Sequence, residues 1–205
     1  MLTRLLGLLV LLGFTSAAAA PPAPSPAAQV QRLYVAQAVT QPLRISQFVR
    51  QMPDTVRAQM LAALARGDIQ GAIALYQLET GRQSIPQWLR LFELAFSAEN
   101  RRPGPCAEVA RRVFAAFQQL GGEPVFLRFT SQGSRFIAFE MRAGEPHSTV
   151  QLSDMSLHVA VRLQDKIYDA FTGPQGLLVD EYMRRLVTEE GYKISTTVLT
   201  SLENL

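Results

Sequence analysis

The sequence predicts an α+β fold in which helices come first and a mostly antiparallel sheet follows. Apolar residues recur at helical spacing from about residue 28 to residue 100. A further helical pattern covers residues 106–120, and short apolar runs separated by Gly, Pro or polar turns come after it. This order predicts a helical N-terminal segment, then one helix that packs on the sheet.

Three helices are expected before residue 100. The first covers residues 55–66 and ends at Gly67, because glycine favours a helix end. Asp68 is expected to cap the second helix, since its side-chain oxygen can accept a free backbone N–H. Ser84 is expected to cap the third, with Pro86 tolerated in the first turn.

The second half of the chain is expected to hold the sheet. The helix over residues 106–120 carries an apolar stripe and ends at Gly121 and Gly122. The expected strands cover residues 125–130, 136–141, 149–152, 157–163, 166–171 and 192–199, with a helix over residues 177–189.

The first 20 residues have the pattern of a secretory signal peptide. Arg4 is followed by a short apolar run and then by small residues. The predicted organisation is a signal peptide at 1–20, a Pro/Ala-rich linker at 21–27, a helical extension at 28–99 and an α+β domain at 100–205. We therefore expect an exported protein, periplasmic or secreted, with no stable membrane span after cleavage. The open alternative is that the segment stays uncleaved as an anchor.

The composition limits the classes of partner and bound group that are expected. With 20 basic and 17 acidic residues, the formal net charge is +3, and the sequence has no long Lys/Arg run. We therefore expect no nucleic-acid partner. The single cysteine cannot form an internal disulfide, and two histidines with one cysteine give no zinc-type spacing. No metal or cofactor site is expected.

Three residues stand in an order that suits nucleophilic catalysis. Cys106 lies at the expected start of a helix, where backbone N–H groups and the helix dipole favour a thiolate. His158 and Asp169 follow on the two strands of a predicted hairpin. If the turn between these strands is tight, Ala160 faces Asp169 and His158 faces Phe171, so His158 and Asp169 are diagonal neighbours on one face.

In this arrangement Cys106 would be the nucleophile, His158 its base and later the acid, and Asp169 the group that fixes the imidazole. Oxyanion stabilisation would come partly from the Cys106 backbone N–H. Asn100 and Gln132 are both conceivable side-chain donors, and the sequence favours neither.

Each residue also has a structural interpretation. Cys106 lies on the apolar stripe of its helix and could be an inert core residue. His158 could be structural, and Asp169 could simply begin a turn. His147 is a weaker candidate for the base, and Tyr168 is expected to serve packing. The alternative to an enzyme is therefore an exported α+β binding or interaction protein with a buried structural cysteine.

Residues 100–186 resemble the papain fold toxin domains of bacterial polymorphic toxins, within the wider clan of papain-like cysteine peptidases and deamidases. The resemblance is carried by Cys106-Ala107-Glu108-Val109-Ala110, His158-Val159-Ala160-Val161 and Ile167-Tyr168-Asp169. Many relatives have a glycine directly after the cysteine, where this chain has Ala107.

The resemblance implies a papain-like catalytic domain over residues 100–205. It further implies a thiol peptidase or glutamine deamidase that acts through a thioacyl-enzyme intermediate, with Cys106, His158 and Asp169 at the matching positions. The implied partners are a protein or peptide substrate and, for a toxin or effector, an immunity or inhibitor protein. Cleavage of cell-wall peptides is a related expectation.

Overall fold

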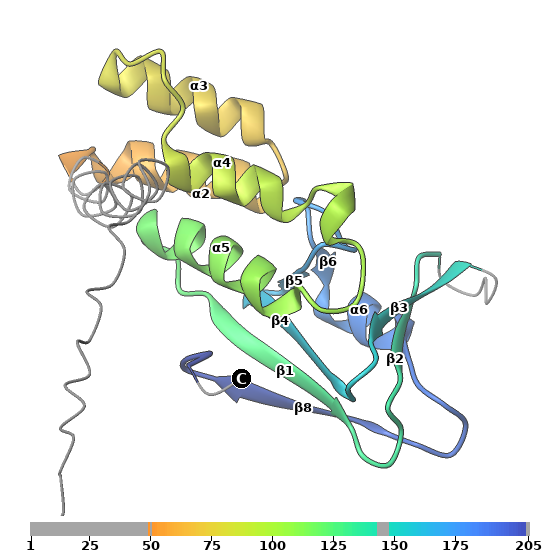
Figure 1. The fold of residues 1–205 in the computed structure, drawn as a ribbon. Coiled ribbons are helices and arrows are strands. Elements are labelled where there is room, and N and C mark those ends of the chain that lie inside the picture. Colours follow the sequence, from red (N-terminus) through yellow and green to blue (C-terminus); the bar gives the residue numbers. More distant parts are fainter. Residues whose placement is uncertain (1–48, 50, 143–147, 204–205) are drawn as a thin grey trace, which may run out of the picture. The chain divides into compact units, whose positions relative to one another are not determined.

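The fold is taken from a computed structural model that describes residues 49, 51–142 and 148–203. The predicted signal peptide, the linker and residues 28–48 of the predicted helical extension lie outside the described residues, as does His147. Within the described part, the α+β prediction is confirmed: helices come first, and antiparallel sheets follow (Figure 1).

The three expected helices are α2 (Asp54–Ala65), α3 (Ile69–Thr80) and α4 (Gln87–Ala95), followed by a short 3-10 turn, η1 (Ala98–Asn100). Asp68 caps α3 as predicted, because its Oδ1 accepts the N–H of Gly71 at 2.8 Å. The prediction that Ser84 caps α4 is wrong. The helix begins directly after Pro86, which takes the cap position with no side-chain hydrogen bond, so Ser84 lies too early to reach the free N–H groups.

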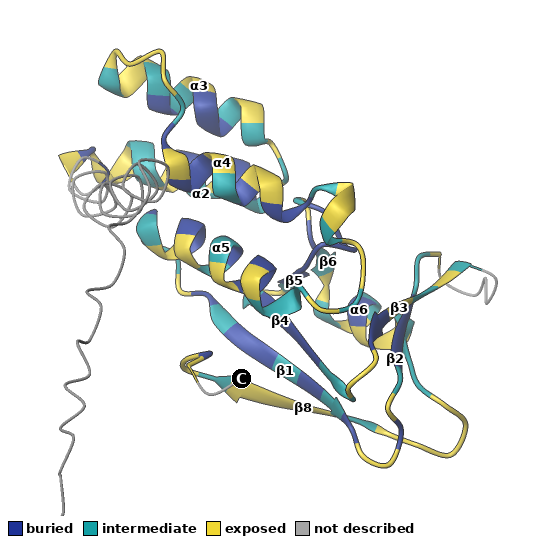
Figure 2. Ribbon diagram, in the orientation of Figure 1, coloured by how far each residue is buried: buried dark blue, intermediate teal, exposed yellow. Residues whose placement is uncertain are grey.

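Helix α5 (Cys106–Gln119) lies between α4 and the sheet. Its apolar stripe is buried, as the dark blue face in Figure 2 shows. The Phe117 ring contacts Phe92 of α4 edge-on, at a centroid distance of 5.4 Å, and Tyr168 of the sheet at 4.9 Å. The helix that begins at Cys106 is therefore fixed by packing on both sides.

Among the described residues, all strand pairs are antiparallel, and the strands form two sheets. The five-stranded sheet has the order β6-β5-β4-β1-β8 and comprises β6 (Leu177–Leu178), β5 (Lys166–Tyr168), β4 (Leu157–Leu163), β1 (Val125–Ser131) and β8 (Ile194–Leu199). The three-stranded sheet has the order β3-β2-β7 and comprises β3 (Thr149–Ser153), β2 (Ile137–Glu140) and β7 (Leu186–Val187).

The β4–β5 hairpin has the register that the sequence predicts. Val161 pairs with Tyr168 and Leu163 with Lys166, across a tight turn in which Gln164 has a positive φ of 55°. Strand β5 ends at Tyr168 rather than at residue 171, because Asp169 starts a turn with its own side chain. This early end shapes the site described below.

The predicted helix over residues 177–189 is shorter than expected. Only α6 (Val179–Arg185) is helical, and both flanking segments are strands. Leu177 pairs with Ile167 of β5, and Leu186 pairs with Phe139 of β2. The ends of the helical pattern are therefore extended because they complete the two sheets. In the described part of the chain, no helix has both the length and the apolar run needed to cross a bilayer.

Candidate active site

Cys106 is the first residue of α5 and carries a free, partly buried thiol. The loop before it turns through Gly104, whose φ of 111° is a backbone conformation that side chains disfavour. The first hydrogen bond within the helix runs from the N–H of Val109 to the oxygen of Pro105. The N–H groups of the preceding residues have no partner inside the helix, so the sulfur lies at a positive helix end.

His158 lies on β4 and is buried. It faces Phe129 of β1 across the ladder, and the two rings stack at 6.2 Å with 24° between their planes. The β4–β5 pairing stops at Val161, so the segment around Val159 is paired with β1 alone. Helix α5 packs on β4, and the backbone N–H of Val159 helps to lower the pKa of the Cys106 thiol.

Asp169 lies directly after β5 and is buried beside the imidazole. His158 Nε2 and Asp169 Oδ2 are 3.0 Å apart. The second carboxylate oxygen, Oδ1, accepts the backbone N–H groups of Phe171 and Thr172, each at 2.8 Å. Asp169 therefore both begins a turn and contacts the histidine. In the same region Arg101 donates to the oxygen of Ala170, which joins this turn to the loop before α5.

Two further residues complete the surroundings of the carboxylate, and the sequence analysis missed both. The buried hydroxyl of Tyr182, on α6, donates to Asp169 Oδ2 at 2.6 Å. The hydroxyl of Thr172 accepts the backbone N–H of Asp169 at 3.0 Å. Thr172 could have been anticipated, because Asp-x-x-Thr is a common turn pattern. Nothing in the sequence pattern singles out Tyr182, because its role depends on the packing of α6.

The thiol of Cys106 has a pKa below its ordinary value of 9.0. Burial is the largest single influence and raises this pKa. The neighbouring His158 side chain lowers it, as do the backbone N–H groups of Val159 and Ala107, and together they outweigh burial. The site therefore favours the thiolate more than an isolated, exposed cysteine would.

The imidazole shows the matching change. Burial lowers the pKa of His158, but its hydrogen bond with Asp169 and its charge interactions with Asp169 and Cys106 raise that pKa from 6.5 to about 9. Burial likewise raises the pKa of Asp169, whereas bonding to His158, Tyr182 and the N–H of Thr172 lowers it below 3.8. A lowered thiol pKa next to a raised imidazole pKa is typical of a thiolate–imidazolium pair. The two groups interact strongly, so their protons titrate as a coupled pair.

The ring nitrogens of His158 have different roles. Nε2 is bonded to Asp169, so Nδ1 is the nitrogen that interacts with the thiol. Nδ1 is buried, and among the described residues it has no hydrogen-bond partner. Hydrogen bonds between catalytic groups commonly become short and well aligned only when substrate binds.

The two candidate oxyanion donors lie in different settings. The Asn100 amide donates to the oxygen of Leu94 at 2.8 Å and closes the end of α4, so it is already engaged. Gln132 is exposed on the loop after β1. Tyr168 is a buried packing residue, since its ring contacts Phe117 edge-on, and its hydroxyl also donates to the oxygen of Ala65 at 2.9 Å. The Cys106 backbone N–H stays the predicted oxyanion donor.

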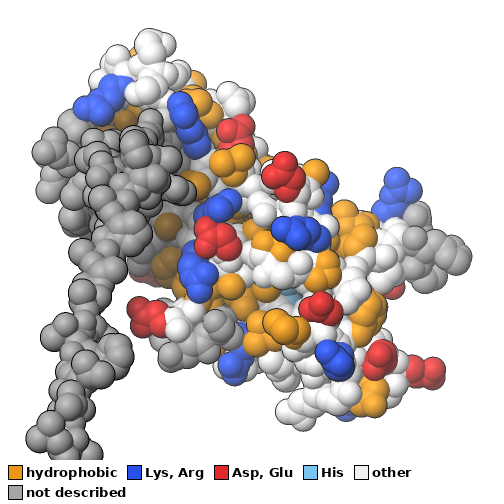
Figure 3. All heavy atoms as spheres, in the orientation of Figure 1, with side chains coloured by type: hydrophobic (Ala, Val, Ile, Leu, Met, Phe, Trp, Pro, Cys, Tyr) orange, Lys and Arg blue, Asp and Glu red, His pale blue; other side chains and the backbone are white. Residues whose placement is uncertain are grey.

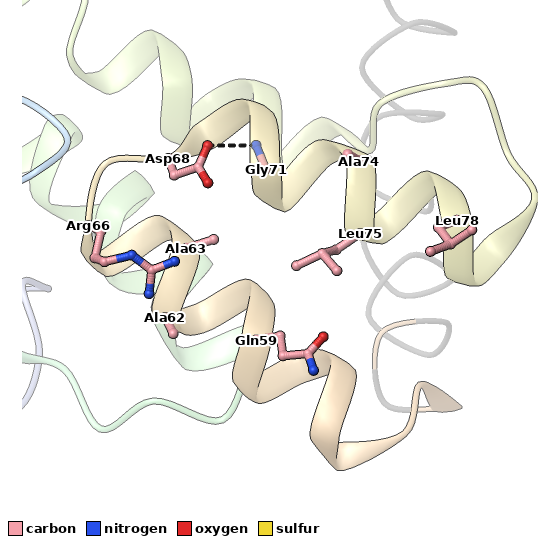
Figure 4. A pocket seen from close by; sticks show the side chains of 9 residues that line it. All are labelled: Gln59, Ala62, Ala63, Arg66, Asp68, Gly71, Ala74, Leu75 and Leu78. Carbon is pink, nitrogen blue, oxygen red and sulfur yellow. Dashed lines mark hydrogen bonds between the residues drawn. The ribbon is translucent and has the colours of Figure 1, made fainter.

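A separate groove of about 480 Å³ lies between α2 and α3 (Figure 4). Its lining comes from those two helices and their connection, with the Asp68–Gly71 hydrogen bond at one end, and includes none of the triad. Within the described residues, no group of three His, Cys, Asp or Glu side chains is placed to hold a metal ion. On the face shown in Figure 3, basic and acidic side chains are interspersed.

Comparisons with protein-family models, with curated proteins and with solved structures found no match.

Proposed function

We propose that this protein is a cysteine hydrolase in which Cys106, His158 and Asp169 act as nucleophile, base and orienting carboxylate. The observation that carries the proposal is the Cys106 thiol at a helix start, next to an imidazole that a buried carboxylate holds at 3.0 Å. The lowered thiol pKa and the raised imidazole pKa support the same roles.

The reaction follows from these positions. His158 Nδ1 takes the thiol proton, and the thiolate attacks a carbonyl carbon to form a tetrahedral oxyanion, which backbone N–H groups at the start of α5 stabilise. As the C–N bond breaks, Nδ1 returns the proton to the leaving nitrogen and a thioester remains on Cys106. His158 then deprotonates water, which hydrolyses the thioester and restores the thiol.

The substrate class in the proposal is a peptide bond or a glutamine side-chain amide, since the resemblance to papain-like toxin domains favours these. The products distinguish the two: a deamidase releases ammonia without cutting the chain, whereas a peptidase creates new amino termini. Either activity is expected to disappear in Cys106→Ala. The proposal includes export and a toxin or effector role, for which the support is the sequence of residues 1–20 and the resemblance.

The test is the rate of iodoacetamide labelling of the folded protein between pH 5 and pH 9.5. Because the thiolate is the reactive form, we expect rapid labelling of Cys106 well below the ordinary thiol pKa of about 8.5. His158→Ala is expected to slow labelling at pH 6 by roughly 10-fold to 100-fold, because the neighbouring positive charge is lost.

The matched control is His147→Ala, which removes the only other histidine of the sequence. Loss of labelling in this variant instead of His158→Ala would assign the base to His147. Labelling that occurs only in denaturant would exclude the hydrolase. It would favour the second candidate function, a binding protein with a structural cysteine, for which the partly buried position of Cys106 on the apolar stripe of α5 is the supporting observation.

A further inference from the structure

The carboxylate of Asp169 accepts more hydrogen bonds than the proposed chemistry requires. Oδ2 accepts the Tyr182 hydroxyl at 2.6 Å and faces His158 Nε2 at 3.0 Å, so one oxygen is shared by two side chains. Oδ1 accepts two backbone N–H groups of the following turn. A carboxylate has about four acceptor positions, and all are used here. Its orientation is therefore fixed, and the Tyr182 bond is the shortest of the four.

The surroundings of Tyr182 keep this donor in place. The side chain is fully buried, and its ring packs against Phe129 at 5.5 Å and Phe139 at 5.1 Å. Helix α6 is held at both ends, because β6 pairs with β5 and β7 pairs with β2. Burial and the charge of Asp169 raise the pKa of Tyr182 well above 10.0, so the hydroxyl stays protonated and donates.

Few charged groups act on the His158–Asp169 pair. In the described structure, α5 presents Cys106, α6 presents Tyr182, and β1 presents the uncharged ring of Phe129. Phe129 packs on both His158 and Tyr182, so the base and the tyrosine ring share one aromatic neighbour. A change at Tyr182 that keeps the ring leaves this packing in place and removes only the hydroxyl. Its effect on the base is therefore expected to pass through Asp169.

We propose that Tyr182 is a positioning residue of this site. Its hydroxyl holds the Asp169 carboxylate. Through this carboxylate, Tyr182 sets the orientation of the His158 ring and the pH at which that ring loses its proton. This proposal rests on the proposed hydrolase function for its biological meaning, but not for its test.

The direction of the effect follows from the shared oxygen. A donor to a carboxylate stabilises its negative charge and lowers its proton affinity. Without the hydroxyl, Asp169 becomes more basic and retains the charged imidazole more strongly, so His158 loses its proton at higher pH. At the same time the carboxylate has one bond fewer to fix its position, and the imidazole is less well oriented toward the thiol.

The test is Tyr182→Phe, which removes one oxygen and keeps the ring. We expect the pH at which His158 loses its proton, measured by NMR of the ring, to rise by about half to one pH unit. The maximal rate of Cys106 labelling is expected to fall about threefold to tenfold. Phe139→Leu is the matched control, since it disturbs the same packing without touching the carboxylate.

The outcomes separate the possibilities. A His158 titration unchanged in Tyr182→Phe, or an equal shift in Phe139→Leu, would overturn the positioning role. If Tyr182→Phe fails to fold, 3-fluorotyrosine at position 182 provides the second test. Its more acidic hydroxyl is a stronger donor, so the titration of His158 should move to lower pH. A wild-type thiol without enhanced labelling would reject the hydrolase, whereas the NMR titration would still test Tyr182.

Discussion

At the scale of single residues, Asp169 combines two roles that the sequence presents as alternatives. Its Oδ1 atom starts the turn after β5 by accepting two backbone N–H groups, and its Oδ2 atom contacts the imidazole. The β4–β5 pairing ends at Tyr168, so Asp169 is no longer held in the ladder. The turn, instead of the strand, therefore determines where the carboxylate points. The structural interpretation of Asp169 is thus part of the catalytic one.

Asp169→Asn tests the charge of this residue with little change of shape. The variant is expected to lose about 10²-fold to 10⁴-fold in hydrolysis rate, because the base is no longer oriented and stabilised by a carboxylate. Burial lowers the pKa of His158, whereas Asp169 and Cys106 raise it, so in this variant His158 should lose its proton at lower pH. NMR titration of the His158 ring measures this change.

Asp165→Asn is the control for that variant, since Asp165 is an exposed residue of the β4–β5 turn. Equal losses in both variants would mean that the carboxylate of Asp169 has no special role.

At the scale of elements, the loop before α5 determines where the thiol lies. Gly104 has a φ of 111°, and no atom lies within 4 Å of the position that a Cβ would take there. Gly104→Ala should therefore cost about 1–2 kcal/mol in unfolding free energy through the backbone alone. Because the loop would relax at the start of α5, we also expect slower labelling of Cys106 near pH 6.

Gly81→Ala is the matched control for this element. Gly81 ends α3 with a φ of 66° and has equally empty surroundings. It should lose similar stability, measured by urea unfolding, with no change in thiol reactivity. Slower labelling in both variants would point to global destabilisation instead of a local effect.

The sequence predicts those elements whose signals are local. The stripe of α5, the Asp68 cap and the β4–β5 register all follow from spacing and turn chemistry, and the structure has them. The candidate site of Cys106, His158 and Asp169 could be predicted for the same reason, because it depends on one helix start and one hairpin. The split of the helix around α6 could not, because its ends become strands only when β5 and β2 are present to pair with them.

At the scale of the whole molecule, the helices and the sheet share one core. The contact of Phe92 with Phe117, and of Phe117 with Tyr168, joins α4, α5 and β5. The Tyr168 hydroxyl continues this connection to the oxygen of Ala65 at the end of α2. Residues 51–99 are therefore expected to unfold together with the site, so charge at the triad contributes to the stability of the whole described fold.

The thiol–imidazole pair has opposing effects on how that stability depends on pH. Folding raises the pKa of His158 from 6.5 to about 9, and this contributes stability that is present below pH 6.5 and is lost as the pH rises through 9. Folding lowers the pKa of Cys106 from 9.0, which contributes stability that is present above pH 9 and is lost as the pH falls. Over the pH range in which folding changes the protonation of both groups, the native protein gains a proton on His158 and loses one on Cys106, so the two effects oppose each other.

Cys106→Ala removes one side of this balance. In the variant the bond to Asp169 still raises the pKa of His158 against the effect of burial. The unfolding free energy of the variant should then fall as the pH rises from 6.5 toward 9, by at most about 1.4 kcal/mol per pH unit. The wild-type protein should change less over the same range. Urea unfolding at four or five pH values measures both slopes, and parallel slopes would mean that the thiol carries no charge in the folded protein.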